Sequence, residues 1–505
     1  MSPAPILPEK IVDIGRRYTS SFSFPYEPCY IHITKIINFE LRCTEDDEGG
    51  ILDLNEILQY GLSNGYPELI RQLEELNLHL HGKTISDSSV YVTLGNTDGV
   101  SKVFQLLVEP DIDTVLTEEF SFASSLNSAR AKGAKLYPIK VDGQGLVPED
   151  LERVLSTWDE KTQGRKPHLL YTIPCGQNPT GSTQPPERYD AIYRIAQEHD
   201  VIIMEDDPYY PLQFANYEPD LEKRKAQLKE ARAKLPTAPE NAKDDDIQAV
   251  AKVFNDYAGV KSYLSRDVDG RVIRIDTFSK VFGPGVRLGW ITANSTFIER
   301  LLRIGETTTQ VPNGLSQSVL ASYLSDRHWG IAGFFRWMWG VRLEYQHKRD
   351  YFLDNLNEYV PKELVTTVPC GAGMFQWLRV DVTSHPRYRK TLIGNSSDAA
   401  INLALDTVGQ EPEIAPGLEL KSSSKSSEQE YTSNTGELID ELFNHLIEYG
   451  KVVVLPAKVF IVEKPGVDQS EDLNFFRATF AGDLENIDAA LKAFGDSIQE
   501  WFQKG

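Results

Sequence analysis

Five short runs rich in β-branched and aromatic residues recur between residues 90 and 290, and helix-like segments separate each run from the next. The runs are SVYVTLG, IDTVLTEEF, HLLYTIPCG, VIIMEDD and RVIRIDTF. Strands that alternate with helices build a mostly parallel sheet whose faces the helices cover. The expected fold class is therefore α/β. The polar loops after the runs should meet at the carboxyl edge of the sheet, where such folds bind their ligands.

A second, smaller α+β domain is predicted after this alternation. It is marked by the strand-like GMFQWLRVDV and KVVVLP and by an amphipathic helix between Leu438 and Ile447. We expect residues 1–55 to form an N-terminal segment that joins the small domain, residues 56–325 to form the large ligand-binding domain, and residues 326–505 to form the small domain.

Two insertions interrupt these domains. Residues 216–248 are charged and are closed by prolines, which predicts an exposed helix and loop between two strands. This segment is either a solvated decoration or a lid or subunit contact. Residues from about 384 to 435 form the second insertion, and its serine-rich part, KSSSKSSEQEYTSNT, predicts a mobile loop.

Charge and composition exclude several classes of protein. The 52 Lys and Arg against 74 Asp and Glu give a net charge of −22, which disfavours nucleic acid as the main partner because phosphate backbones select basic surfaces. The four cysteines form no C-x-x-C pair and the histidines form no metal-spaced cluster, so we predict neither a metal site nor a disulfide scaffold. No apolar run approaches the roughly 20 residues of a membrane span, and the start lacks an apolar signal core. The expected location is cytoplasmic, without a membrane partner.

Lys280 and Arg287 lie seven residues apart in FSKVFGPGVRLGW, directly after the last strand-like run. GPGVRLG is not a dinucleotide fingerprint because its third glycine, Gly289, comes one place late, and GNTDGVSK lacks the GK[ST] of a Walker loop. With these motifs excluded, the segment offers the amine of Lys280, the hydroxyls of Thr277 and Ser279, and the guanidinium of Arg287, which a flexible turn brings close to them. These donors suit a dianionic phosphate, and an amine beside the phosphate is the partner of an aldehyde. The inferred ligand is pyridoxal 5′-phosphate, bound covalently to the lysine.

Three further residues suit the same ligand. Its pyridine nitrogen must stay protonated, and Asp206 in VIIMEDDPYY supplies a carboxylate at a neighbouring strand end. Asn178 in QNPTG and Tyr209 offer donors to the phenolate oxygen. Taken singly, Lys280 reads as a surface lysine, Asp206 as a turn or capping carboxylate, and NPTG as a turn. The order and separation of the loops make the set more specific than its members.

The motifs GNTDG, NPTG, DDPYY, SK followed by Arg287, and FFRATF resemble those of the fold-type I, class I/II aminotransferases that use pyridoxal phosphate. The resemblance extends from about residue 56 to 481, apart from the two insertions. The GMFQW run and the long insertions are most similar to the fungal aromatic and 2-aminoadipate aminotransferases, which are related to kynurenine aminotransferase II. The resemblance implies transfer of an amino group from an aromatic or 2-aminoadipate-like L-amino acid to a 2-oxo acid such as 2-oxoglutarate, by a ping-pong mechanism.

The resemblance also implies a role for each matching residue. Lys280 would carry the cofactor and move the substrate α-proton, and Asp206 would pair with the pyridinium nitrogen. Asn178 and Tyr209 would hold the phenolate oxygen. The phosphate would be bound by Asn96, Thr97, Thr277, Ser279 and Arg287. With Asp206 and Tyr209, Lys280 makes up the expected catalytic set.

Three more residues complete the implied site. Phe122 falls where the family has an aromatic ring stacked on the cofactor, with a core phenylalanine as the alternative. Arg477, in FFRATF, would bind the substrate α-carboxylate together with Asn178, and the alternative is a snorkelling edge residue. Tyr60 would reach the phosphate in a neighbouring subunit, which implies a homodimer with shared active sites.

Other readings and departures remain open. A lyase or cyclising enzyme on the same scaffold shares nearly every cofactor residue. A non-catalytic, ligand-sensing regulator would carry a basic DNA-binding module, whereas the first 50 residues hold five basic and eight acidic side chains. INFELRCTEDDEGGILDL replaces the family's glycine- and proline-rich segment and leaves the side-chain pocket undefined. We expect Cys175 to be a structural thiol and FFRWMWG, residues 334–340, to pack a helix.

Overall fold

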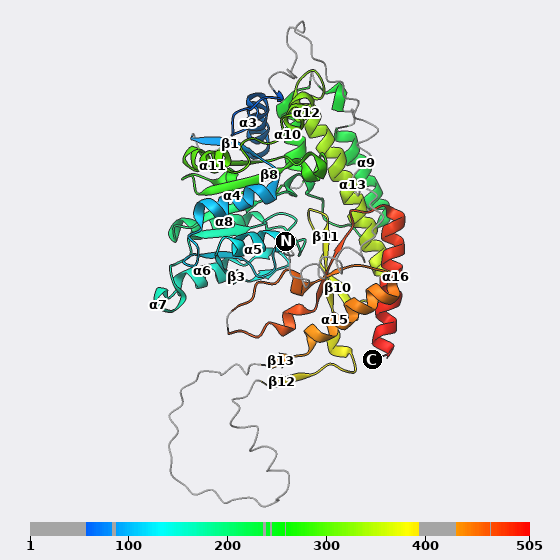
Figure 1. The fold of residues 1–505 in the computed structure, drawn as a ribbon. Coiled ribbons are helices and arrows are strands. Elements are labelled where there is room, and N and C mark those ends of the chain that lie inside the picture. Colours follow the sequence, from blue (N-terminus) through cyan, green and yellow to red (C-terminus); the bar gives the residue numbers. More distant parts are fainter. Residues whose placement is uncertain are drawn as a thin grey trace, which may run out of the picture.

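The computed structural model describes residues 57–82, 87–235, 239–242, 245–257, 259–392, 431–464 and 466–504. The predicted N-terminal segment, residues 1–55, and most of the serine-rich loop lie outside the described residues. Figure 1 shows two sheets, one built from the blue-to-green part of the chain and the other from its yellow-to-red part. These two sheets and the helices around them position the candidate site.

The larger sheet has seven strands in the order β1-β9-β8-β7-β6-β2-β3. The strands are β1 (Ser88–Thr93), β2 (Thr114–Glu118), β3 (Lys135–Ile139), β6 (Leu169–Thr172), β7 (Ile202–Asp206), β8 (Val272–Thr277) and β9 (Gly289–Asn294). From β8 to β3 all neighbours pair in parallel, and β9 pairs antiparallel with both β8 and β1. The expected α/β class with a mostly parallel sheet is confirmed. The five runs correspond to β1, β2, β6, β7 and β8.

Helices cover both faces of this sheet. The helices of this part are α3 (Pro67–His81), α4 (Asn96–Leu107), α5 (Ala123–Ala131), α6 (Pro148–Ser156), α7 (Glu160–Gln163), α8 (Pro186–Glu198), α11 (Ser295–Thr307) and α12 (Gly314–Leu324). Leu116, Leu170 and Ile203 pack with Tyr189 and Ile192 of α8, while alternate residues of the same strands belong to the main core with α4. Strands that are buried on both faces have nearly continuous apolar sequences. This burial explains why the five strand-like runs could be recognised in the sequence.

The smaller sheet has the order β10-β11-β15-β14 and is antiparallel throughout. Its strands are β10 (Val365–Thr367), β11 (Phe375–Val380), β14 (Leu455–Pro456) and β15 (Phe475–Thr479), and α15 (Thr435–His445) and α16 (Leu484–Lys504) accompany it. KVVVLP differs from the expectation, because only its last two residues pair as a strand. Lys451 adopts the left-handed conformation (φ 53°) where the preceding helical segment ends, and the chain pairs only four residues later.

Short strands frame the second insertion. β12 (Lys390–Leu392) pairs antiparallel with β13 (Tyr431–Ser433), and Leu392 lies opposite Tyr431. Part of the predicted serine-rich loop is therefore a strand.

A separate hairpin joins β4 (Val141–Asp142) to β5 (Gly145–Leu146).

The first insertion forms a helix between β7 and β8, α9 (Leu221–Lys234), which α10 (Ile247–Asp256) follows. Most of α9 is exposed, but Arg224 and Ala231 are buried against α13 (Gly330–Tyr359). Arg224 donates to Asp354 over 3.1 Å, and Trp339 Nε1 donates to the Ala231 carbonyl over 3.2 Å. The insertion is therefore anchored along α13 rather than solvated throughout.

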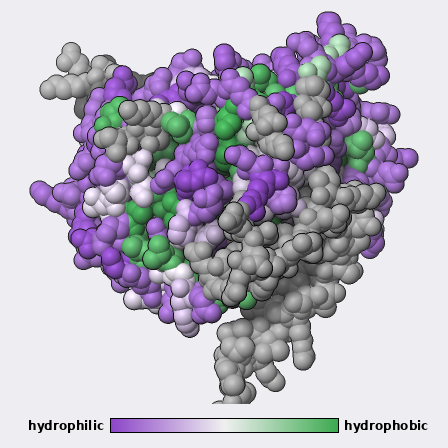
Figure 2. All heavy atoms as spheres, turned by 90° about the horizontal axis from the view of Figure 1, so that it is seen from above, coloured by the Kyte–Doolittle hydropathy of each residue, from purple (hydrophilic) through white to green (hydrophobic). Residues whose placement is uncertain are grey.

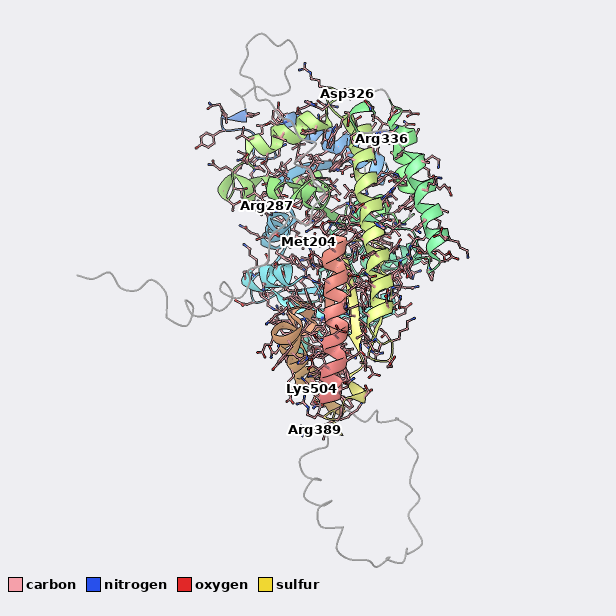
Figure 3. All side chains as sticks on the ribbon, turned by 90° about the vertical axis from the view of Figure 1, so that its right-hand side faces the viewer. Met204, Arg287, Asp326, Arg336, Arg389 and Lys504 are labelled. Atoms are coloured by element: carbon pink, nitrogen blue, oxygen red, sulfur yellow. The ribbon has the colours of Figure 1, made fainter. Side chains whose placement is uncertain are left out.

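The aromatic run FFRWMWG lies in α13, and its aromatic side chains are buried as expected. Figure 3 shows α13 beside α16, with the labelled Arg336 near one end of α13 and Lys504 at the end of α16. The proposed boundary between residues 325 and 326 falls just before α13, which packs against helices α10, α12 and α16. The division into domains stays a prediction.

The visible surface is mostly polar. Figure 2 shows one face on which hydrophilic residues predominate and hydrophobic residues form small, separate patches. Among the described residues, no helix combines the length and the apolar character needed to cross a membrane.

Candidate active site

A cavity of about 320 Å³ lies where the loops after β1, β2, β6, β7 and β8 meet strands β11 and β15 of the smaller sheet. Eleven predicted site residues line this one cavity: Asn96, Thr97, Phe122, Asn178, Asp206, Tyr209, Thr277, Ser279, Lys280, Arg287 and Arg477. Parallel strands end at the same sheet edge, so loops far apart in the sequence converge there.

Tyr60 is the exception among the predicted residues. Its side chain is 88% exposed and it does not line the cavity. Its implied role is in a neighbouring subunit, so its exposure does not conflict with that role, which stays a prediction.

Lys280 ends the short helix η5 (Phe278–Lys280), which directly follows β8. Its Nζ lies 5.9 Å from the centre of the Tyr209 ring. Burial lowers the pKa of Lys280 below its usual value, the positive charges of Arg287 and Arg477 lower it further, and Asp206 opposes them. A lowered pKa favours the neutral amine, which is the form that acts as a nucleophile or a base.

Arg287 follows the short helix η6 (Pro284–Val286) in the left-handed conformation, with φ of 50°. Its Nη2 donates to the Leu94 carbonyl over 2.9 Å, and its Nη1 lies 3.5 Å from Ser279 Oγ. Gly95 has φ of 99°, and a Cβ there would lie 2.9 Å from Nη2 of this arginine, so glycine allows the guanidinium to lie against the start of α4. Within the described residues, the side-chain partners of Arg287 are the Ser279 hydroxyl and the carbonyls of Leu94 and Pro284, and none is a carboxylate. The guanidinium thus lies beside the start of α4, an arrangement that suits an anion because the first N–H groups of a helix carry partial positive charge.

The two hydroxyls beside Lys280 have different surroundings. Thr277 Oγ1 caps η5 by accepting from the Ser279 N–H over 3.1 Å, and it also lies 3.1 Å from the Leu288 carbonyl and 2.9 Å from Ser279 Oγ. Ser279 Oγ lies between this hydroxyl and Arg287. Thr277 is therefore engaged in shaping the turn, and Ser279 is the hydroxyl placed beside the guanidinium.

Asp206 ends β7, and donors from two elements hold its carboxylate. Asn96 Nδ2 donates to Oδ1 over 2.6 Å, and the Tyr171 hydroxyl donates to Oδ2 over 2.7 Å. Burial raises the pKa of Asp206 above its usual value, and these two hydrogen bonds oppose that rise, as do the charges of Lys280 and Arg274. The Asn96 side chain therefore contacts Asp206, and its expected contact with phosphate stays a prediction. As the first residue of α4, it lies beside the end of β8, where its amide also contacts the Ile275 carbonyl.

Arg477 projects from β15 of the smaller sheet into the same cavity. Its guanidinium lies 4.2 Å from the centre of the Phe375 ring and 4.9 Å from that of Phe460, and Nη1 donates to Asn178 Oδ1 over 2.7 Å. Burial lowers the pKa of Arg477 to about 10, so it stays charged at neutral pH. Its described partners are an amide and two aromatic rings and none is a carboxylate, so this half-buried cation is suited to bind an anionic ligand.

Several residues around the site were not predicted. Tyr171, Ser125 and Phe375 each contact the cavity or its carboxylate. Beneath them, the fully buried Arg274 forms ion pairs with Glu205, Asp207 and Asp276, at 3.1, 3.0 and 2.7 Å. For Tyr171 and Arg274, the only sequence signal is a polar or charged side chain inside an otherwise apolar strand run, which does not by itself indicate a partner.

Cys175 fits the expected structural thiol. It is fully buried, and burial raises its pKa well above the usual value, which makes it a poor nucleophile. The neighbouring Asn178–Pro179 peptide bond is cis.

The chain is similar to known proteins over most of its length. Residues 34–494 match the family model for aminotransferase class I and II. The L-tyrosine:2-oxoglutarate aminotransferase atrD of Tapinella panuoides is 37% identical over 464 residues, which cover 90% of this chain and 81% of that protein. An aromatic amino acid aminotransferase of Schizosaccharomyces pombe is 38% identical over 371 residues, 71% of this chain and 72% of that protein. The solved structure of the aminotransferase Aro8 from Candida albicans matches with a TM-score of 0.72 and 31% identity over 92% of this chain and 83% of that one.

Proposed function

The chain belongs to the aminotransferase class I and II family and is a pyridoxal-phosphate-dependent enzyme, and we propose that it moves the amino group of an aromatic L-amino acid to 2-oxoglutarate. The two relatives named above act on tyrosine or aromatic amino acids, and one of them uses 2-oxoglutarate. The reaction class rests on one observation: a single cavity is lined by Lys280 and by two guanidinium groups, those of Arg287 and Arg477, which have no acidic partners among the described residues.

The residues of the cavity fit pyridoxal 5′-phosphate. Arg287, Ser279 and the start of α4 offer donors for the phosphate, and a Cβ at Gly95 would meet the Arg287 guanidinium in this arrangement. Asp206 offers a carboxylate for the ring nitrogen, and Lys280 offers the amine for the aldehyde. When bound, the cofactor supplies this aldehyde and a ring that withdraws electrons from the substrate α-carbon.

The protein's own groups then have separate tasks. Arg477 binds the α-carboxylate of the amino acid and so orients its α-carbon toward Lys280, whose neutral amine takes and returns the α-proton. The Asn178 carbonyl oxygen is engaged by Arg477 over 2.7 Å, which leaves its amide nitrogen as a donor to the cofactor oxygen. Tyr209 supplies the second donor. The oxo acid occupies the same site in turn, because its carboxylate needs the same guanidinium.

The test follows the visible absorbance of the purified holoenzyme. Added phenylalanine should remove the band of the lysine-bound cofactor and release the oxo acid, and 2-oxoglutarate should restore the band. The same cycle with 2-aminoadipate tests the other donor class that the sequence predicts. A band that shifts with phenylalanine and does not return with 2-oxoglutarate, accompanied by a cleaved or cyclised product, would instead establish the lyase alternative.

The proposal includes a homodimer in the cytoplasm. Tyr60 lies beside two other exposed apolar residues, Leu58 at 61% and Leu62 at 62% exposed. A second copy of the chain would cover this apolar strip and bring Tyr60 to the phosphate of its neighbour. Sedimentation of the holoenzyme should give twice the mass of one chain, with dissociation favoured by Leu62→Asp. A species with the mass of one chain and full activity would rule out shared active sites.

A further inference from the structure

Uncharged donors hold both oxygens of the Asp206 carboxylate. Asn96 Nδ2 lies 2.6 Å from Oδ1, and the Tyr171 hydroxyl lies 2.7 Å from Oδ2. Asn96 is the first residue of α4, and Tyr171 lies in β6, the strand that pairs with β7, at whose end Asp206 lies. The two donors therefore come from rigid elements on different sides of the carboxylate.

A third side chain completes this arrangement. Ser125 Oγ lies 2.8 Å from the Tyr171 hydroxyl. An ionised carboxylate accepts and cannot donate, so the Tyr171 proton must point to Asp206 and Ser125 must donate to the tyrosine oxygen. Burial and the charge of Asp206 raise the pKa of Tyr171 well above its usual value, so this hydroxyl keeps its proton throughout the working range of an enzyme.

Such a carboxylate needs these donors. Asp206 and Tyr171 are both buried, and desolvation disfavours a charged carboxylate unless hydrogen bonds compensate. Donors fixed by a strand and a helix also restrict rotation of the carboxylate, which a single contact would not do. The partners of Asp206 thus stabilise its charge and fix its direction.

We propose that Tyr171 and Asn96 are positioning residues that hold the Asp206 carboxylate for the cationic ring nitrogen of the bound cofactor. This inference rests on the proposed function, and it assigns Asn96 to Asp206 instead of to the phosphate. Tyr171 touches the cofactor only through Asp206, since it does not line the cavity. Its removal should weaken one interaction, the one between the carboxylate and the ring nitrogen.

The test compares cofactor binding by the wild type and by Tyr171→Phe, with two ligands. One ligand is pyridoxal 5′-phosphate, and the other is its analogue with carbon in place of the ring nitrogen. The variant should bind pyridoxal phosphate about tenfold more weakly, the size expected when a charged group loses one hydrogen bond. The analogue cannot interact with the carboxylate through a ring cation, so both proteins should bind it within about twofold of each other.

Tyr189→Phe is the matched control. Tyr189 is also a fully buried tyrosine, but its hydroxyl has no hydrogen-bond partner in the part of the chain that the structure describes. This variant should bind both ligands as the wild type does. Circular dichroism and thermal unfolding of the apoproteins check that each variant folds.

Each other outcome overturns part of the assignment. Equal weakening for both ligands would show that Tyr171 only supports the fold of the cavity. Unchanged binding of pyridoxal phosphate would remove the positioning role altogether. If Tyr171→Phe fails to fold, Asn96→Ala tests the other donor by the same comparison of ligands. A wild type that does not bind pyridoxal phosphate would refute the cofactor assignment itself and not this inference.

Discussion

Lys280→Ala should abolish turnover and the visible band of the lysine-bound cofactor. Within the described lining of the cavity, Lys280 is the one amine, so no other group can take its place as nucleophile or base. Loss of general acid–base catalysis alone lowers the rate by roughly 10² to 10⁴, and loss of covalent attachment adds to that effect. Turnover with phenylalanine and 2-oxoglutarate, measured together with the absorbance of the dialysed protein, checks the expectation.

Lys252→Ala is a suitable control for this substitution. Lys252 lies on α10, where its side chain is 74% exposed and pairs with Asp256. It should retain the band and the rate, because an exposed ion pair contributes little to stability. Normal turnover by Lys280→Ala with an intact fold would remove this lysine from the mechanism.

Arg477→Leu should lower kcat/KM for phenylalanine by roughly 10²-fold or more, because removing one partner of a desolvated, hydrogen-bonded charge pair costs about 2–5 kcal/mol. Leucine keeps apolar contact with Phe375 and Phe460, so the loss reports the guanidinium and not the packing. The folded protein should not lose stability, since the variant removes a half-buried cation that has no acidic partner among the described residues.

The substrate carboxylate can be tested directly with phenylethylamine, which lacks it. The wild type should react far faster with phenylalanine than with the amine, and this preference should largely disappear in Arg477→Leu. Arg379→Leu on the neighbouring strand β11 is the matched control, because Arg379 is exposed and outside the cavity. A variant at Arg477 that keeps the full preference would place the substrate carboxylate elsewhere.

The loop residues of the site were predictable because each lies at or shortly after the end of a strand-like run. Asp206 ends such a run, and Asn178 and Lys280 follow within a few residues. Parallel strands bring their carboxyl ends to one edge whatever the order of the strands in the sheet. Arg477 comes from the other sheet, and only its motif indicated it.

Contacts within the sheet could not be predicted in the same way. The bond from Tyr171 to Asp206 depends on β6 and β7 being neighbours and on their register, in which Tyr171 lies opposite Met204. Nothing in HLLYTIPCG specifies that neighbour. Arg274 likewise meets Asp207 only through the pairing of β8 with β7. The sequence therefore predicted the side chains at the ends of the strands. It did not predict the side-chain contacts between neighbouring strands.

The two sheets divide the site in a way that bears on how such enzymes diversify. Lys280 and Arg287 lie between β8 and β9, which are locked together by the pairing of Thr277 with Gly289 in the larger sheet. Arg477 and Phe375 are carried by β15 and β11 of the smaller sheet, with Phe375 opposite Thr479. With the roles proposed here, substitutions in the smaller sheet would change which substrate is accepted, while Lys280 and Arg287 would keep their mutual geometry. New substrate preferences can thus evolve, or be engineered, without rebuilding the chemistry.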